Sequence, residues 1–176
     1  ILLARDWDGK GTTLTPSGYP FVVKAVQRGS RLEQAKELYR GNASDMTVQP
    51  LVLTDGDGQR LVMIQRSVTF FESRFAVVEG DKLRWLALPT KSEIQGLLHK
   101  RLILSVQEDW KPQGLPVVAA GSLVSVDPMA PEKAVEVILT PTPSQAIDQV
   151  SVTKNTVLIT FFDKVRGRAM RFKEMQ

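Results

Sequence analysis

Four stretches of the chain repeat one pattern, in which an apolar run is followed by polar or aromatic residues and then by a loop. They read LLARDWDGKG from Leu2, VMIQRSVTFFES from Val62, LILSVQEDWKPQG from Leu102 and VLITFFDKVRG from Val157, at spacings of about 40 to 60 residues. A unit of about 50 residues with four short antiparallel strands has the size of a β-propeller blade. The repeat therefore favours a propeller, with an ordinary β-sandwich as the alternative.

The segments that flank the repeated stretches support the same unit. A strand and a turn precede three of them, in VQPLVLTDGDGQR, EIQGLLHKR and IDQVSVTKN, and edge-like strands follow, in YPFVVKAVQ, LRWLALP, SLVSVD and AMRFK. We therefore expect residues 1–176 to form a single all-β segment, a partial β-propeller of about three to four four-stranded antiparallel blades.

Short strands account for most of the chain. Several of them alternate apolar and polar residues, as half-buried strands do. VLITFF (Val157–Phe162) and LVMI (Leu61–Ile64) are continuously apolar, which predicts strands covered on both faces. The predicted strands are Leu2–Arg5, Pro20–Gln27, Glu37–Tyr39, Thr47–Thr54, Arg60–Arg66, Thr69–Val78, Lys82–Leu88, Glu93–Leu98, Leu102–Gln107, Ser122–Val126, Ala134–Leu139, Ala146–Thr153, Thr156–Phe162 and Ala169–Lys173.

Hairpin-sized connectors separate many of these strands. The segments TDGDGQR, EGDK, LHKR and TKNT each lie between apolar runs, and two of them contain Asp-Gly or Gly-Asp. One segment competes with the all-β interpretation. In Ser30–Tyr39, Ser30 with Glu33 forms a capping-box pattern, so we expect a short helical turn from Ser30 that gives way to a strand near Glu37, with a full helix as the alternative.

The count of units predicts that this piece belongs to something larger. The chain begins at Ile1 inside an apolar run, and a propeller closes its ring with about four to eight blades. An arc of fewer blades leaves apolar faces open to water. Either further blades of a longer protein cover those faces, or copies of the chain self-associate.

Charge and composition exclude several classes of partner and site. The 23 Lys and Arg residues are scattered and the net charge is only +4, so neither nucleic acid nor a membrane is expected as a partner. No apolar run approaches the roughly 20 residues of a membrane span, and no signal peptide is visible. We expect a cytoplasmic protein, with the periplasm as the alternative. Without cysteine there is no disulfide, thiolate metal site or Cys nucleophile.

A run of ordered pieces resembles the propeller of bacterial prolyl oligopeptidase-type serine peptidases. In RDWDGKGTTLTPSGYPFVVKAVQRGSRLEQAKELYRG, from Arg5 to Gly41, Asp-Trp, Ser-Gly-Tyr-Pro, a strand ending in a basic residue and Gly, and aromatic-Arg-Gly follow in the family's order. The resemblance continues over nearly the whole chain in VTFFES, SEIQGLLHKRLILSVQEDW, GSLVSVD and VRGRAMRF.

The resemblance implies a two-domain serine peptidase in which a seven-bladed propeller caps the active site of an α/β-hydrolase domain. Such a peptidase cleaves short peptides after proline, and its propeller filters oligopeptide substrates by size. This chain would supply middle blades, about half of the ring. Its partners would be the hydrolase domain of the same protein and the oligopeptide substrates. The alternative function is a β-propeller scaffold for protein–protein interaction without peptidase activity, because fold alone does not decide function.

The residues themselves predict that catalysis lies elsewhere. A Ser-His-Asp triad on an α/β-hydrolase needs a Gly-x-Ser-x-Gly elbow, and the chain has none. His99 is the only histidine and lies in LLHKRLIL, which reads as a solvated hairpin turn. DGDG (Asp55–Gly58) begins like a calcium loop but lacks the closing ligands, so we interpret it as a turn. We assign no catalytic residue, cofactor or metal to the chain.

The two Asp-Trp pairs are the candidate contact residues. Trp7 or Trp110 would stack on a peptide in a channel or at its rim, and Asp6 or Asp109 would meet a basic partner. The alternative is a Trp packed between blades with the Asp capping the following loop. Arg166, with Arg66 and Arg74, is a further candidate for a channel or domain contact. The candidate channel or rim residues are Asp6, Trp7, Asp109, Trp110 and Arg166.

Overall fold

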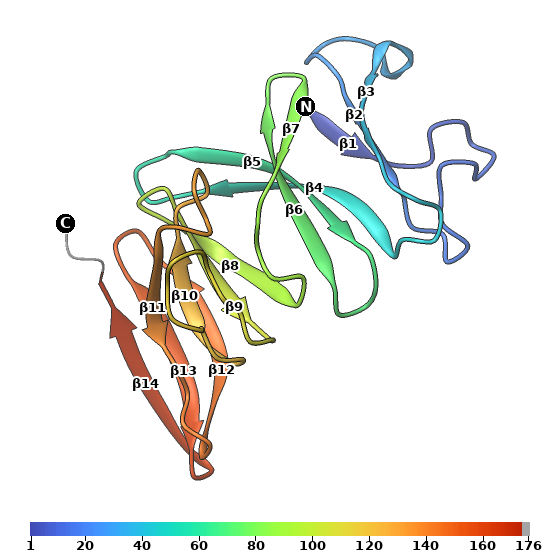
Figure 1. Ribbon diagram of the computed structural model, residues 1–176. Helices are drawn as coiled ribbons and strands as arrows, with labels where there is room; N and C mark the ends of the chain where they lie inside the picture. The colour runs from blue at the N-terminus through green and yellow to red at the C-terminus, as the bar shows by residue number, and fades with distance from the viewer. Residues whose placement is uncertain (174–176) are drawn as a thin grey trace. The chain divides into compact units, whose positions relative to one another are not determined.

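The computed structural model describes residues 1–173, which consist of β-strands, loops and one short 3-10 helix (Figure 1). The all-β prediction is confirmed for these residues, and no helix within them is long and apolar enough to cross a membrane. In chain order the elements are β1 (Leu2–Ala4), β2 (Val22–Ala25), η1 (Leu32–Gln34), β3 (Lys36–Arg40), β4 (Thr47–Thr54), β5 (Arg60–Ser67), β6 (Ser73–Glu79), β7 (Lys82–Trp85), β8 (Ser92–Leu98), β9 (Arg101–Val106), β10 (Leu123–Val126), β11 (Val135–Leu139), β12 (Gln145–Val152), β13 (Val157–Asp163) and β14 (Arg166–Phe172).

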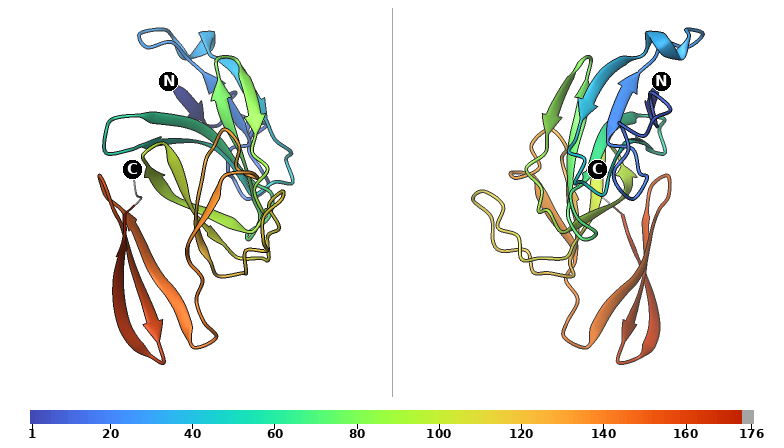
Figure 2. Two further views of the ribbon diagram at one scale, coloured as in Figure 1. Left: turned by 60° about the vertical axis from the view of Figure 1, so that its left-hand side comes forward. Right: turned by 90° about the vertical axis from the view of Figure 1, so that its right-hand side faces the viewer.

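The strands of residues 1–173 form four sheets, each built from strands that follow one another in the sequence. Their orders are β1-β2-β3, β4-β5-β6-β7, β11-β10-β9-β8 and β12-β13-β14. The pairings whose register is defined are antiparallel, as short hairpin connections require. The twist of the last sheet is visible in Figure 2, where β13 and β14 wind around each other.

The repeated sequence stretches correspond to these sheets. The repeated stretches contain β1, β5, β9 and β13, and the strands β4, β8 and β12 precede three of them, as predicted. Of the four strands predicted to be edge-like, β7 in LRWLALP and β14 in AMRFK are terminal strands of their sheets, whereas β2 in YPFVVKAVQ and β10 in SLVSVD lie inside theirs. The strand predicted at Thr69–Val78 is β6, which begins at Ser73 and not at Thr69, because residues 68–72 form a turn closed by the Val68 N–H donating to Glu72 O.

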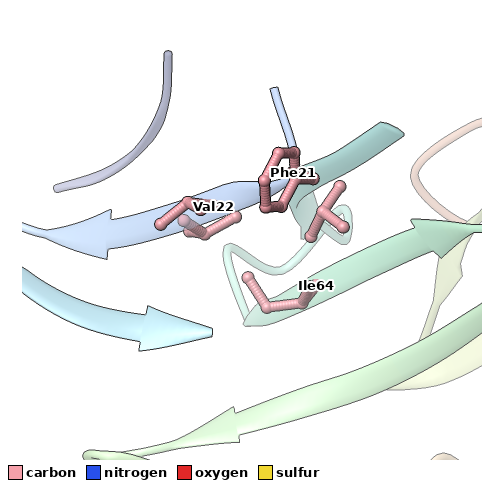
Figure 3. Close-up of a cluster of buried hydrophobic side chains, with 5 residues drawn as sticks. Phe21, Val22 and Ile64 are labelled. Atoms are coloured by element: carbon pink, nitrogen blue, oxygen red, sulfur yellow. The ribbon is translucent and has the colours of Figure 1, made fainter. Parts of the chain in front are cut away.

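The chain divides into two compact units, each with its own core. The first unit contains residues 1–52 and 62–86. At its centre Phe21 and Val22 meet Val48 and Ile64, which are buried side chains from neighbouring sheets (Figure 3). Leu2, Trp7, Leu38, Tyr39 and Leu83 are among the half-buried side chains packed around this cluster.

The second unit contains residues 53–61 and the chain from Ala87 onward. Its central cluster joins the sheets β8–β11 and β12–β14, and its buried members are Leu98, Ile103, Leu123, Val157 and Ile159. Apolar side chains of β12 and β14 pack around them. The core of the second unit therefore lies between two consecutive sheets, as expected for face-to-face packing of twisted sheets.

Continuously apolar strands differ in how they are covered. In LVMI both Met63 and Ile64 are fully buried, so this strand is covered on both faces as predicted. The same prediction for VLITFF is wrong: β13 alternates, with Val157 and Ile159 buried but Leu158 and Phe162 47% and 46% exposed. The inner face of β13 packs on the central cluster of the second unit, and its outer face is exposed at Leu158, Thr160 and Phe162.

The helical turn predicted after Ser30 is present as η1, and β3 follows at Lys36. The predicted capping box is wrong, because Arg31 precedes the helix and no side chain caps it. A helix of three residues with no buried side chain has little to gain from a cap. Two hairpins are closed by non-glycine residues with positive φ, His99 with Lys100 and Lys164 with Val165, the geometry that type I′ turns require.

Candidate functional site

The first Asp-Trp pair lies in the loop between β1 and β2 and closes that loop on itself. Asp6 Oδ2 accepts the N–H of Gly11 (3.1 Å) and Asp6 Oδ1 accepts the hydroxyl of Thr13 (3.3 Å). The indole of Trp7 packs against the core of the first unit and donates from Nε1 to Val22 O at 3.0 Å. The ammonium of Lys24 lies 4.7 Å from the Trp7 ring, a cation–π geometry.

The second pair occupies the matching connection, between β9 and β10. Asp109 Oδ1 accepts the N–H of Ala120 at 2.9 Å. Trp110 is only 9% exposed, and its backbone pairs with Val118 through two hydrogen bonds of 2.9 and 2.7 Å. In both loops the carboxylate therefore ties the outgoing segment to the returning one, and the indole faces into protein.

These contacts show that four residues stabilise their own loops: Asp6, Trp7, Asp109 and Trp110. Their role as channel or rim contacts stays a prediction, as does that of Arg166, which is exposed at the first position of β14. The two Asp-Trp pairs stand at equivalent places in two sheets, with the sheet β4–β7 between them in the sequence. This agrees with the sequence repeat, in which each Asp-Trp pair follows the apolar run of its stretch.

Two other arginines are held by neighbours in the first unit. Arg66 forms a two-pronged ion pair with Asp45, with both N–O distances 2.9 Å, and the Asp45 side chain is almost fully buried. Arg74 lies over the ring of Trp85 at 5.4 Å. A two-pronged, largely buried Arg–carboxylate pair fixes both partners, so Arg66 holds the fold of its unit.

The turn predicted at DGDG is confirmed, and its first carboxylate has a specific role. Asp55 accepts the backbone N–H groups of Asp57 and Gln59 in its own turn, and that of Lys100 in the β8–β9 turn. Burial raises the pKa of Asp55, but these N–H groups outweigh it and hold the pKa below its usual range. Asp55 thus joins two hairpin turns within the second unit.

His99 lies in a turn as predicted, but it is not a solvated side chain. Only 21% of it is exposed, and its Nδ1 is 3.6 Å from Asp57 Oδ2. Lys154 Nζ approaches the other oxygen of the same carboxylate at 3.7 Å. Within residues 1–173 no group of three or more His, Cys, Asp or Glu side chains is arranged to hold a metal ion.

The second unit contains a cavity of about 780 Å³. It lies beside β8 and β12, the first strands of two consecutive sheets. Glu93 and Gln95 line it from β8, Ser105 from β9, and residues 145–151 of β12 line it without a gap. Ala120, whose N–H is held by Asp109, forms part of the wall.

The shape of the cavity follows from how β8 and β12 diverge. At one end the strands touch so closely that a Cβ on Gly96 would lie 2.7 Å from Cγ2 of Val152. Each strand then contains a register shift, after Ile94 in β8 and after Ile147 in β12. The shifts leave Gln95 and Asp148 unpaired in the register, and both residues line the cavity. A β-bulge re-aims a side chain in this way.

Sequence reasoning missed Gln95 and Asp148, although a signal for them was present. Apolar residues of a strand recur at every second position, but Ile94 is followed by Leu97 and Ile147 by Val150, three positions later. The skip occurs at the same place in both units of the repeat. Such a shared skip identifies a β-bulge. The side chain of the additional residue is then expected to leave the regular alternation of the strand.

Comparison with known proteins supports the relationship predicted from the sequence. No protein-family model matches the chain. It is 28% identical over 98% of its length to an uncharacterized peptidase of Sinorhizobium fredii and spans about a quarter (25%) of that peptidase. The structure of a post-proline cleaving enzyme from Rickettsia typhi superposes on 94% of the chain with a TM-score of 0.83 at 22% identity, over 25% of its own length.

Oligopeptidase B from Trypanosoma brucei superposes on 89% of the chain with a TM-score of 0.61 at 16% identity, and 22% of its length is covered. The chain is thus related in sequence to peptidases, and its fold is that of a partial propeller found in their solved structures. The resemblance to the prolyl oligopeptidase family of serine peptidases is confirmed.

Proposed function

We propose that this chain is a non-catalytic section of the propeller of a prolyl oligopeptidase-type serine peptidase, about half of its ring. In the whole protein the propeller caps the active site and admits oligopeptides by size. The observation that carries the proposal is the extent of the alignment with a peptidase. It includes 98% of this chain but only 25% of the length of the peptidase. The consecutive meander sheets of residues 1–173 supply the blade pattern.

The lack of a recognisable catalytic triad in the sequence supports the non-catalytic role. The sequence contains no Gly-x-Ser-x-Gly elbow, and its one histidine is engaged in a turn beside Asp57. The hydrolase domain of the same protein would therefore supply the triad, and the substrates would be oligopeptides that contain proline. This domain and these substrates are the partners that the proposal assigns to the chain.

The test compares the chain with a whole peptidase that contains it, using a fluorogenic peptide with an internal proline. We expect the whole protein to cleave the peptide and the chain alone to show only background. Turnover by the chain would overturn its non-catalytic role. A whole protein that leaves the peptide intact would overturn the assigned activity. For the size filter, the same proline sequence is placed in a loop of a folded protein, which should resist cleavage.

The exposed outer face of β13 supports a second part of the proposal, self-association of the isolated chain. Leu158 and Phe162 lie on that face, where burial against another apolar layer would remove their surface from water. Light scattering after size exclusion should show a dimer or larger species at micromolar concentration. A monomer would show that these faces are stable in water on their own.

One observation favours the alternative of a protein-binding scaffold. Phe70 and Phe71 are 80% and 76% exposed at the β5–β6 turn, with ring centroids 5.1 Å apart in an edge-to-face arrangement. Exposed aromatic side chains of this kind are typical anchors of protein contacts. A whole protein without peptidase activity, whose binding to a partner protein is lost on replacing both residues with serine, would establish the scaffold instead.

A further inference from the structure

We propose that the cavity beside β8 and β12 binds an extended peptide segment that carries positive charge. The proposal rests on the proposed function only in taking a peptide as the occupant. The charge, the strand edges and the bulges around the cavity each indicate part of that occupant.

The charge of the lining opposes that of the chain as a whole. Glu93 and Asp148 both line the cavity, and no Lys, Arg or His is among the described residues that line it. The chain itself has 23 Lys and Arg against 19 Asp and Glu. Thr160 donates to one oxygen of Asp148 at 3.2 Å, which orients that carboxylate. A concave site with two carboxylates favours a cation, because the low-dielectric walls concentrate the negative potential.

The strands beside the cavity offer a place for a peptide backbone. β12 and β8 are the terminal strands of their sheets, so no strand of residues 1–173 pairs with their outer edges. Such an edge presents a row of N–H and C=O groups that an extended peptide can join as an additional strand. The residues of β12 that line the cavity, 145–151, would match a peptide of about five to seven residues at about 3.3 Å per residue.

The side chains around the cavity suit a peptide better than a compact cation. Gln107, Gln145 and Gln149 line it, and each side-chain amide can both donate to and accept from a peptide group. The bulged residue Gln95 is oriented by its own bond to Ser105 Oγ at 3.1 Å. The closure at Gly96 and Val152 ends the cavity on one side, so a bound segment would run from that end toward Glu93.

The experiment measures binding of short labelled peptides to the chain by fluorescence anisotropy. The probes are an acetylated hexapeptide amide with two lysines, its analogue with glutamine in place of lysine, and a lysine peptide whose alternate backbone amides are methylated. We expect the lysine peptide to bind most tightly, with affinity falling as salt is raised. The glutamine and the methylated analogues should each bind at least about threefold more weakly, the first through lost charge and the second through lost backbone pairing.

Matched variants locate the binding. The double variant Glu93→Gln/Asp148→Asn should weaken binding of the lysine peptide by about three- to tenfold. The control Asp81→Asn/Glu136→Gln removes the same charge from exposed positions outside the cavity and should leave affinity unchanged. Circular dichroism verifies that all variants keep the fold.

Three results would overturn the inference: no binding by the folded chain, equal affinity for the three peptides, or equal loss in both double variants. These results are independent of cleavage. A chain that binds the lysine peptide while the whole protein cleaves nothing would retain this site and remove the proposed function. If the whole protein cleaves its peptide but the chain does not bind the lysine peptide, the proposed function stands and the cavity site is overturned.

Discussion

The two Asp-Trp loops share a pattern of sequence but are stabilised differently. In the β1–β2 loop, Asp6 accepts two donors, and the Trp7 indole is half-buried with a hydrogen bond to Val22 O. In the β9–β10 loop, Asp109 accepts one N–H, and Trp110 is buried with its backbone paired to Val118. The first loop therefore depends more on polar contacts, and the second more on burial of the ring.

The comparison shows which feature the two repeated loops share and which differs between them. They share the closing carboxylate, and they differ in the surroundings of the indole. Both loops keep the carboxylate that closes the connection, because the N–H groups of a returning segment need an acceptor wherever the loop is long. The indole serves a local purpose in each unit, since the packing available beside β2 differs from that beside β10. A repeated motif of this kind identifies a position in a fold before it identifies a contact with a ligand.

The largest expected effect comes from Trp110→Ala, which should destabilise the chain by about 3–5 kcal/mol because it empties a buried aromatic position. Trp7→Ala should cost less, since part of the Trp7 ring already faces water. Urea unfolding followed by circular dichroism measures both. Equal losses in the two variants would show that the rings are buried to the same degree in solution.

Replacing the two carboxylates should give the next largest loss of stability. Here the first loop should lose more than the second, the reverse of the order expected for the tryptophans. Asp6→Ala removes the acceptor of two hydrogen bonds and should cost about 1–2 kcal/mol, and Asp109→Ala, which loses one, about 1 kcal/mol. Amide exchange of Gly11 and Ala120 reports the two loops separately. Asn at either position keeps an acceptor oxygen and should restore most of the protection. If Asn behaves as Ala does, charge rather than hydrogen bonding closes the loops.

Much of this fold was predictable because strands joined by hairpins, and the turns between them, are encoded by residues close together in the sequence. The strand at Thr47–Thr54 was predicted with its observed bounds, and the turns at DGDG and LHKR were recognised from residues a few positions apart. The two-sided burial predicted for VLITFF failed for a non-local reason. Composition fixes what a strand is able to bury, but only the layers around it decide whether both faces are covered.

The candidate site was less predictable than the fold. The Asp-Trp pairs were visible as a sequence pattern, but the cavity depends on two strands about fifty residues apart, which meet at Gly96 and Val152. Nothing local to Asp55 shows that its carboxylate accepts the N–H of Lys100. Such contacts are set by how sheets stack, so sequence patterns indicate the residues available for them and not the partners.

A smaller effect should follow from Trp7→Phe, which keeps a ring but removes the donor to Val22 O. We expect a loss of about 0.5–1.5 kcal/mol, the usual net contribution of one hydrogen bond. Protection of the amides around β2 should fall, while Ala120 in the other loop keeps its exchange rate. A loss as large as that of Trp7→Ala would show that packing, and not the hydrogen bond, holds the indole.

The smallest and most selective effect should come from acid, because the two loops differ in the residue after tryptophan. Asp8 in the first loop accepts the Thr12 hydroxyl and the Lys10 N–H, which lower its pKa from 3.8 to about 2; the second loop has Lys111 there. A carboxyl whose pKa is lower in the folded chain adds stability above pH 3.8 and loses it as pH falls through 2. The Lys10 amide should therefore shift with a midpoint near 2 in an NMR titration, and Asp8→Asn should abolish that shift and leave Ala120 unchanged. A midpoint at 3.8 would mean that the Asp8 contacts do not form in solution.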